Sequence, residues 1–311
     1  MIFVYSLIFG IIIYSFLIPF LRKKKLGQAI RFEGPEAHLA KKGTPTMGGL
    51  GFIISSFILF LGFAVYYSYD YKIVILLLGS FLMFGLVGFC DDFLIIKRGK
   101  NDGLSAKTKI ILELIIGVMF YYLYQYFGFS TKFFIELGLL YLPFVVLMLI
   151  SSSNAFNLTD GLDGLLGGLS IICFSALGYI AYLNENEVIF VFILSLLGGL
   201  FSFMIFNYNP AKIFMGDTGS LALGGIAGVL AILLKVEIIF IIMALPFILE
   251  TLSVIIQVLY YKKTKKRFFK MAPLHHHFEL MGYSEKSVVF IFWMFGLIMA
   301  LIGLIIYGGI K

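Results

Sequence analysis

Carboxylate side chains stand at two places in the sequence where they could hold a cation. Asp91 and Asp92 are adjacent at the end of an apolar run, and Asp217 lies between glycines in the run Gly216-Asp217-Thr218-Gly219. Adjacent carboxylates repel each other unless a cation or several hydrogen-bond donors compensate them. A carboxylate at the head of a helix, beside backbone N–H groups, suits a hard cation and phosphate oxygens. The alternatives are a solvated helix end for the pair and a helix N-cap for Asp217.

A third polar cluster follows another apolar run. Asn157, Asp160 and Asp163 recur at i, i+3 and i+6, so a helical turn would present them on neighbouring faces. The glycines that follow permit close approach of a backbone or a ligand. A plain connection between helices would not need so many polar groups, which favours a binding role over a simple loop.

Three of the four histidines are consecutive, in the run Pro273-Leu274-His275-His276-His277-Phe278-Glu279. Zinc binding is one alternative, but neighbouring residues on a helix point about 100° apart and rarely converge on one ion. Anion binding or acid–base work on a phosphate suits the histidines better. A surface histidine run is the remaining interpretation.

The elements that position these residues lie in a membrane. Hydrophobic residues make up 61% of the 311 residues and charged residues 13%, with a mean hydropathy of +1.02. A soluble chain of this size could not hide so much apolar surface. The composition therefore excludes a disordered chain, a disulfide scaffold and a soluble nucleic-acid-binding protein. The two cysteines, Cys90 and Cys173, are expected to be small packed hydrophobes.

Ten apolar segments are long enough to cross a bilayer, which requires about 20 residues. They are 2–21, 47–66, 72–90, 108–127, 133–152, 164–183, 188–206, 218–234, 238–261 and 287–308. Open sheet edges cannot face lipid, and the alternation of an outer-membrane barrel is absent. The sequence predicts an all-α, polytopic membrane protein with a single transmembrane domain over residues 1–311. The first segment lacks a basic start, which favours a retained helix over a cleaved signal.

The basic residues predict the orientation of these helices. Twenty of the 24 Lys and Arg residues fall in the connections after the first, third, seventh and ninth segments. The alternate set holds only Lys72, Lys132, Lys235 and Lys311. Because basic residues concentrate in cytoplasmic loops, both termini are expected outside and the polar clusters on the cytoplasmic face.

This one-sided distribution of polar residues favours a surface site over a conduit. A channel or carrier usually places polar residues part-way through several helices, and here Glu250 alone lies near mid-depth, close to Pro246. A transporter is therefore a remote alternative. Carboxylates, histidines, lysines and glycine-rich turns on one face, without a Walker-type loop, indicate Mg²⁺-dependent transfer of a phosphorylated group. One partner is expected to be a lipid.

Five motifs carry a resemblance to a known family. They are Lys42-Gly43-Thr44-Pro45-Thr46-Met47-Gly48-Gly49, Asp91-Asp92, Asn157-Leu158-Thr159-Asp160-Gly161-Leu162-Asp163-Gly164, Phe214-Met215-Gly216-Asp217-Thr218-Gly219-Ser220 and Pro273-Leu274-His275-His276-His277-Phe278-Glu279. Together they resemble the phospho-N-acetylmuramoyl-pentapeptide transferase (MraY) family, over essentially the whole chain. The resemblance implies a homodimer in the bacterial inner membrane that requires Mg²⁺ as its cofactor.

The resemblance also implies a reaction. UDP-N-acetylmuramoyl-pentapeptide and undecaprenyl phosphate would give undecaprenyl-pyrophosphoryl-N-acetylmuramoyl-pentapeptide (lipid I) and UMP, in the first membrane step of peptidoglycan synthesis. The alternative is a related enzyme that transfers N-acetylglucosamine-1-phosphate to a polyprenyl phosphate. The shared aspartate motifs do not separate the two, but relatives of the second kind carry a different histidine–arginine pattern in place of the histidine run.

Individual roles follow from the same resemblance. Asp217 is the expected Mg²⁺ ligand, and Asp91 and Asp92 are expected to hold the acceptor phosphate and metal region, with Asp91 the candidate base. The remaining residues are expected to bind substrate. Lys42 and Lys107 would neutralise the charge of the phosphates, and the nucleotide and pyrophosphate cleft would be lined by Asn157, Asp160, Asp163 and Asn207. The diphosphate or the muramoyl group would be contacted by His275, His276 and His277, of which His276 is also a catalytic candidate. Glu250 and Gln257 are expected to shape a kinked wall where the prenyl chain meets the site.

Two catalytic routes agree with these residues. In the direct route the lipid phosphate attacks the β-phosphate of the nucleotide sugar. In the two-step route an aspartate attacks first and leaves a covalent phosphosugar enzyme. Direct attack is favoured, because a phosphate monoester is mostly dianionic near neutral pH and is already a competent nucleophile.

Overall fold

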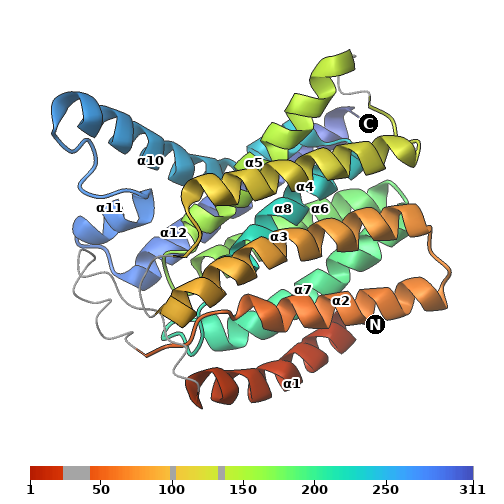
Figure 1. The fold of residues 1–311 in the computed structure, drawn as a ribbon, viewed down its shortest axis with the longest axis horizontal. Helices are drawn as coiled ribbons and strands as arrows, with labels where there is room; N and C mark the ends of the chain where they lie inside the picture. Colours follow the sequence, from red (N-terminus) through yellow and green to blue (C-terminus); the bar gives the residue numbers. More distant parts are fainter. Residues whose placement is uncertain (24–42, 99–102, 132–136, 311) are drawn as a thin grey trace.

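The computed structural model describes residues 1–23, 43–98, 103–131 and 137–310, which form a bundle of long helices running in alternating directions (Figure 1). The elements are α1 (Ile2–Lys23), α2 (Gly49–Tyr66), α3 (Tyr71–Arg98), α4 (Ala106–Tyr126), η2 (Gly138–Leu140), α5 (Tyr141–Thr159), α6 (Leu165–Leu183), α7 (Glu187–Asn207), α8 (Gly216–Leu234), α9 (Glu237–Met243), α10 (Leu245–Thr264), α11 (Leu274–Leu280) and α12 (Glu285–Ile310). The all-α, polytopic fold predicted from the sequence is confirmed.

Nine helices in the described part of the chain are long and apolar enough to cross a membrane. They correspond to nine of the ten predicted segments. The remaining predicted segment, 108–127, is helix α4, which has 21 residues and is not among these nine. It carries Lys107, Lys109 and Glu113 in its first half, and two of these three side chains belong to the polar site described below.

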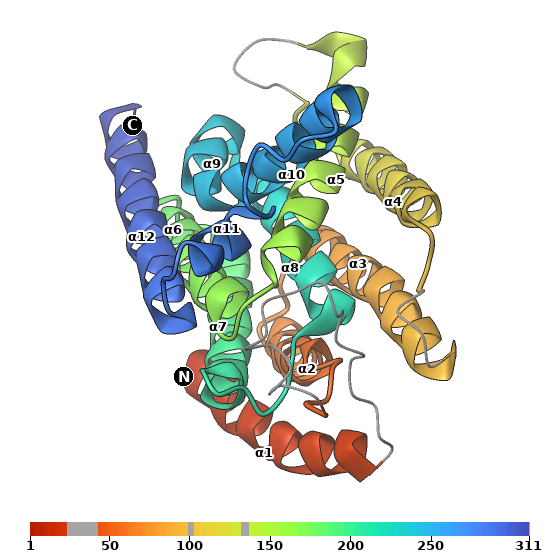
Figure 2. The ribbon, with the colours of Figure 1, turned by 90° about the vertical axis from the view of Figure 1, so that its left-hand side faces the viewer.

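Helix α8 lies in the middle of the bundle, with α3 and α5 packed along it (Figure 2). Glycines allow this close packing. A Cβ atom added at Gly224 would lie 2.4 Å from the carbonyl oxygen of Ser152 on α5, and one at Gly225 would lie 2.3 Å from the ring of Phe84 on α3. Small residues at helix contacts are typical of membrane bundles, where close packing stabilises association. The glycines thereby fix the first turn of α8 relative to α3 and α5.

Two helices extend further than predicted at the same end of the bundle. Helix α3 continues to Arg98, eight residues past the predicted end, and α5 continues to Thr159. The polar residues there do not end the helices, because neighbouring elements satisfy their side chains. The Ser152 hydroxyl donates to the carbonyl oxygen of Gly224, 2.6 Å away, and Ser153 donates to Glu113. Asp91, Asp92 and Asn157 therefore lie on helices, not in loops.

The ninth predicted segment is two helices instead of one. Helix α9 ends at Met243 and α10 begins at Leu245, with Pro246 in its first turn. Proline lacks a backbone N–H and is tolerated at the start of a helix but not inside one, which explains the break. Beyond the break α10 leaves the bundle (Figure 1), and its buried residues are confined to Pro246, Phe247, Glu250 and Ser253.

The polar motifs gather at one end of the bundle, here called the carboxylate end. It holds the ends of α3, α5, α7 and α10 and the starts of α4, α6, α8 and α12. Both termini lie at the opposite end, to the right in Figure 1. This matches the predicted separation of the termini from the motifs, while the orientation of the bundle across a membrane stays a prediction.

Candidate active site

Three carboxylates form the centre of the carboxylate end. Asp91 and Asp92 come from the last turns of α3, and Asp217 comes from the first turn of α8. One oxygen from each of the three lies within 4.8 Å of the others. The structure therefore brings together residues that are separated by well over a hundred positions in the sequence, as the motifs predicted.

Asp92 holds the start of α8. One of its oxygens accepts a hydrogen bond from the backbone N–H of Asp217 at 3.2 Å, and the other accepts from the N–H of Thr218 at 3.0 Å and from its hydroxyl at 2.6 Å. The first N–H groups of a helix have no partner within the helix, so a carboxylate here satisfies them and interacts favourably with the helix dipole. Asp92 thus positions Asp217, and it is 4% exposed.

Asp217 is oriented by two side chains from other helices. The amide of Asn157 on α5 donates to Oδ1 of Asp217 at 2.9 Å, and the same amide also donates to Ser220. The ammonium of Lys109 on α4 donates to Oδ2 at 2.9 Å. Asp217 keeps about a quarter of its side chain exposed, so it is the most accessible of the three carboxylates.

Asp91 lies under the chain segment that leads into α4. Its Oδ1 accepts from the backbone N–H of Leu104 at 2.7 Å and lies 3.4 Å from the Lys109 ammonium. A Cβ atom at Gly103 would lie 2.5 Å from the same carboxylate, so only glycine allows this segment to cover Asp91 so closely. The carbonyl of Gly103 accepts from Arg98, which holds the segment in place.

Lys109 and Glu113 are site residues that the sequence motifs did not single out. Glu113 is fully buried one turn after Lys109 on α4, and it accepts from Asn154 at 2.6 Å and from Ser153 at 3.0 Å. The available signal was the spacing of Lys109 and Glu113 at i and i+4 within an otherwise apolar helix. Lys107, which was singled out, is exposed on the first turn of α4. Lys42, also predicted to bind phosphate, lies outside the described residues.

Asp160 caps the carboxylate end of α5 beside the cluster. Its burial, followed by the charges of Asp217 and Asp92, raises the pKa of Asp160 from its ordinary value of 3.8 to about 8. The raised pKa reflects the cost of burying a charged carboxylate and, to a smaller extent, the cost of placing it beside other carboxylates. A cation bound at the cluster would lower that cost.

Asp163 and Asn207 tie the neighbouring loops together. Asp163 accepts from the amide of Asn209 at 3.2 Å and from the N–H of Ala211 at 3.0 Å. Asn207 accepts from the N–H of Gly164 and donates to the carbonyl oxygen of Ile213, both at 2.9 Å. These bonds engage both ends of the Asn207 amide with backbone groups. Both residues are buried at positions that shape the loops, and their predicted contact with substrate stays a prediction.

The histidine run lies on the short helix α11 and packs against the Asp160–Gly164 loop. His275 is buried, with Nδ1 3.2 Å from Glu250 on α10, and its Nε2 points at Gly161, where a Cβ atom would lie 2.1 Å away. His276 pairs with Glu279 at 2.8 Å, and Nδ1 of His277 accepts from the N–H of Lys270.

Gln257 on α10 fixes the segment that leads to α11. Its side-chain oxygen accepts from the N–H groups of Phe268 and Phe269, and its amide donates to the carbonyl of Phe269. Together with the Glu250–His275 contact, this anchors α11 to the part of α10 that leaves the bundle. Glu250 and Gln257 therefore hold α11 and the segment before it against α10, and their predicted place where the prenyl chain meets the site stays a prediction.

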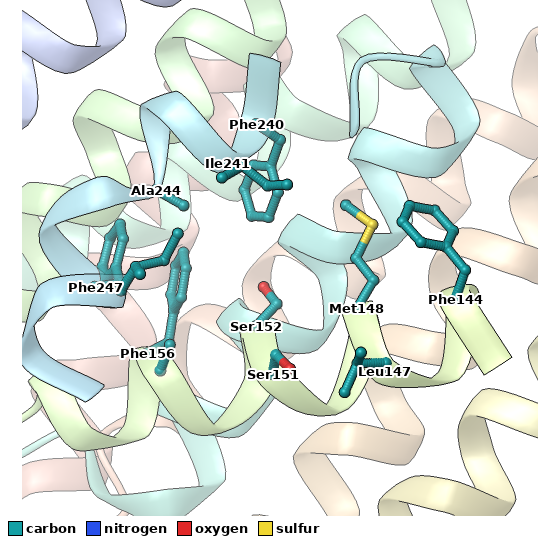
Figure 3. Close-up of a pocket in the computed structure, with 12 residues that line it drawn as sticks. Phe144, Leu147, Met148, Ser151, Ser152, Phe156, Phe240, Ile241, Ala244 and Phe247 are labelled. Atoms are coloured by element: carbon teal, nitrogen blue, oxygen red, sulfur yellow. The ribbon is translucent and has the colours of Figure 1, made fainter. Parts of the chain in front are cut away.

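An apolar cavity of about 230 Å³ lies beside the break between α9 and α10 (Figure 3). Side chains of α5, α9 and α10 line it, and Phe156 and Phe247 stack at one side with their ring centroids 3.9 Å apart. Phe156 directly precedes Asn157, so the cavity ends next to the residue that orients Asp217. The cavity and the carboxylates are thus connected through the last turns of α5.

The donor set of the cluster suits a hard divalent cation. Carboxylate oxygens are the ligands that Mg²⁺ prefers, and it binds proteins through one or two of them together with substrate phosphates. Among these groups the three carboxylates are accompanied by one ammonium, that of Lys109, so negative charge is in excess. Asp217 is the best placed of the three as a metal ligand. Both oxygens of Asp92 accept hydrogen bonds from the start of α8, and Asp91 is covered by the Gly103–Leu104 segment.

The fold and the site define a polytopic, all-helical membrane protein with a carboxylate cluster able to hold a metal ion. The family model for glycosyl transferase family 4 matches residues 73–235, and signature 1 of the phospho-N-acetylmuramoyl-pentapeptide-transferases matches residues 41–53. The chain belongs to the phospho-N-acetylmuramoyl-pentapeptide-transferase family, as the sequence motifs predicted.

Relatives of the same name match along nearly the whole chain. The phospho-N-acetylmuramoyl-pentapeptide-transferase of Bacillus subtilis (strain 168) is 45% identical over 304 residues, which cover 96% of this chain and 94% of the relative. That of Staphylococcus epidermidis (strain ATCC 35984) is 46% identical over 317 residues, with 98% of each chain covered. The protein is a membrane-bound phosphoglycosyl transferase and a multi-pass protein of the bacterial inner membrane.

Proposed function

We propose that the protein transfers phospho-N-acetylmuramoyl-pentapeptide from UDP-N-acetylmuramoyl-pentapeptide to undecaprenyl phosphate, giving lipid I and UMP with Mg²⁺ as cofactor. The observation that carries the proposal is the Asp91–Asp92–Asp217 cluster, in a chain whose near-full-length relatives carry this enzyme's name. The N-acetylglucosamine-1-phosphate and transporter alternatives have no comparable support.

The cluster and its surroundings suit phosphoryl transfer. This chemistry depends mainly on positioning and on neutralising the charge of the phosphates. Asp217 would hold Mg²⁺, which would neutralise charge on the diphosphate. Asn157 fixes the orientation of Asp217, and Asp92 fixes the helix that carries it. Asp91 is 3% exposed under the Gly103–Leu104 segment, so the attacking lipid phosphate would reach it only once this segment has shifted.

The apolar cavity suits the lipid substrate. Its walls are almost entirely apolar, and Leu147 and Ile241 line it while remaining 66% and 51% exposed on the outside of the bundle. A prenyl chain would therefore enter from the surrounding lipid and lie against α5, α9 and α10. The stacked rings of Phe156 and Phe247 would lie where its phosphate end approaches the cluster.

UMP release tests the reaction, the substrate and the metal site together. Detergent-solubilised protein would receive Mg²⁺ and undecaprenyl phosphate, with UDP-N-acetylmuramoyl-pentapeptide and UDP-N-acetylglucosamine offered in parallel. We expect turnover of the muramoyl donor alone, reduced on the order of 10²–10³-fold in Asp217→Ala. Turnover of the glucosamine donor instead, or of neither donor by folded protein, would contradict the proposal.

Two parts of the proposal have tests of their own. Direct attack by the lipid phosphate predicts no exchange of labelled UMP into the muramoyl donor when lipid is absent, and such exchange would favour the two-step route. The homodimer expected from the family resemblance predicts twice the chain mass when detergent-solubilised protein is sized by light scattering. A monomer of full activity would remove the homodimer from the proposal.

A further inference from the structure

The position of Lys109 raises a question about how a divalent cation reaches the cluster. Its ammonium lies 2.9 Å from Oδ2 of Asp217 and 3.4 Å from Oδ1 of Asp91, between the α8 and α3 carboxylates. The other oxygen of Asp217 is held by Asn157. The edge of Asp217 that faces Asp91 is therefore already occupied by a positive charge that belongs to the chain itself.

A divalent cation on that edge and the ammonium exclude each other. Mg²⁺ contacts its oxygen ligands at about 2.0–2.1 Å and keeps an octahedral shell of ligands and water around it. An ammonium within hydrogen-bonding distance of the same oxygen would lie inside that shell, and the two like charges would repel. Binding of the metal to Asp217 therefore requires Lys109 to leave Oδ2.

The structure gives Lys109 room to leave. Its side chain is 23% exposed, so it lies at the opening of the site rather than in the core. It stands on the first turns of α4, next to the N-cap Ser105, on a flexible four-carbon stem. A diphosphate bound at this opening would offer the displaced ammonium new negative partners at short range.

We propose that Lys109 is an internal counterion of the metal site, which occupies the cation position in the substrate-free enzyme and moves to the substrate's diphosphate when the metal binds. The inference rests on the proposed function for the identity of the diphosphate. Binding of the metal and binding of the nucleotide then favour each other. The metal displaces the Lys109 ammonium, which the diphosphate accepts, and the diphosphate draws Lys109 away from Asp217, which the metal then binds. Free enzyme then has low affinity for the metal, and the donor substrate raises it.

Metal binding measured without turnover tests the inference. Mn²⁺ would be titrated into detergent-solubilised full-length protein, with free Mn²⁺ followed by electron paramagnetic resonance, in the presence and absence of UDP. We expect Lys109→Met to bind Mn²⁺ about tenfold more tightly than wild type when UDP is absent. UDP should raise the Mn²⁺ affinity of wild type by more than it raises that of K109M.

Matched variants separate this effect from general electrostatics. Lys97→Met removes the same charge from the exposed last turn of α3, the helix that carries Asp91 and Asp92, so its Mn²⁺ affinity should stay within about twofold of wild type. Asp217→Asn should lose the site. If K109M folds poorly, Lys109→Gln should show the same gain, and in either variant Mn²⁺ should raise the melting temperature more than in wild type.

The outcomes are distinct from those of the proposed function. Mn²⁺ affinity that is unchanged or weaker in both K109M and K109Q would overturn the inference, because Lys109 would then not compete with the metal. Tighter binding in these variants supports the inference even where neither nucleotide donor is turned over, a result that overturns the proposed function alone. Absence of Mn²⁺ binding in wild type with and without UDP overturns both.

Discussion

Thr218 shows how a side chain outside the motif carboxylates sets the geometry of the site. Its hydroxyl donates to the buried Asp92 at 2.6 Å, the shortest of the three bonds that join Asp92 to α8. Thr218→Val keeps the shape of the side chain but removes one of the hydrogen-bond donors to the Asp92 carboxylate. We therefore expect the free energy of unfolding to fall by about 1–3 kcal/mol and the rate of turnover to decrease. Thermal unfolding and UMP release measure both, and Thr218→Ser, which keeps the hydroxyl, should stay close to wild type.

Asp160 predicts a pH dependence in the metal-free protein. Its pKa is raised to about 8, so the folded state keeps a proton that the unfolded state releases above about pH 4. The resulting loss of stability grows as the pH rises from 4 and levels off above 8. Asp160→Asn removes this loss, so in EDTA the variant should melt above wild type at pH 9 and much less so at pH 5. An equal difference at both pH values would contradict the prediction.

The residues of the site were predictable from the sequence to different degrees. Asp91, Asp92, Asn157 and Asp217 belong to motifs whose polar types stand out in an apolar chain, and the structure brings these four together. Lys109 did not stand out, because a lysine near a predicted cytoplasmic loop is ordinary in a membrane protein. Its role depends on the packing of α4 against α3 and α5, which the local sequence does not encode.

At the scale of elements, the contact between α3 and α8 determines where Asp217 lies. A Cβ atom at Gly88 would stand 2.0 Å from the carbonyl oxygen of Asp217. Gly88→Ala must therefore push the start of α8 away from Asp91 and Asp92, and we expect turnover to fall at least about 100-fold. Gly79→Ala on the same helix, with nothing within 4 Å of the added atom, should keep activity and gain slightly in stability. UMP release and thermal unfolding of the two variants provide the comparison.

The positions of the helices could be predicted from apolar length, but their ends could not. The predicted ends fell where polar residues begin, whereas α3 and α5 continue through Asp92 and Asn157 because other helices satisfy those side chains. The break before α10 did have a local signal in Pro246. Helix ends inside a bundle are thus set by tertiary hydrogen bonds, and apolar periodicity carries no information about those bonds.

At the scale of the whole molecule, the two ends of the bundle should face different compartments. Basic residues predict that the carboxylate end is cytoplasmic. In a Cys90→Ser background, with Cys173 buried, we expect Glu185→Cys to react with a membrane-impermeant maleimide added to intact cells stripped of their outer barrier. Lys266→Cys, on the exposed segment after α10, should react only after lysis. The reverse pattern would invert the predicted orientation.

The proposed entry of the prenyl chain into the apolar cavity beside Leu147 and Ile241 has a kinetic consequence. A substrate that enters there arrives by lateral diffusion, so its effective concentration is its mole fraction in the bilayer, while a nucleotide that enters at the carboxylate end is counted per volume of water. In proteoliposomes, adding inert phospholipid at a fixed total amount of undecaprenyl phosphate should slow the reaction, whereas adding buffer at a fixed nucleotide concentration should not. The rate of the enzyme would then follow the composition of the membrane as directly as the supply of its soluble substrate.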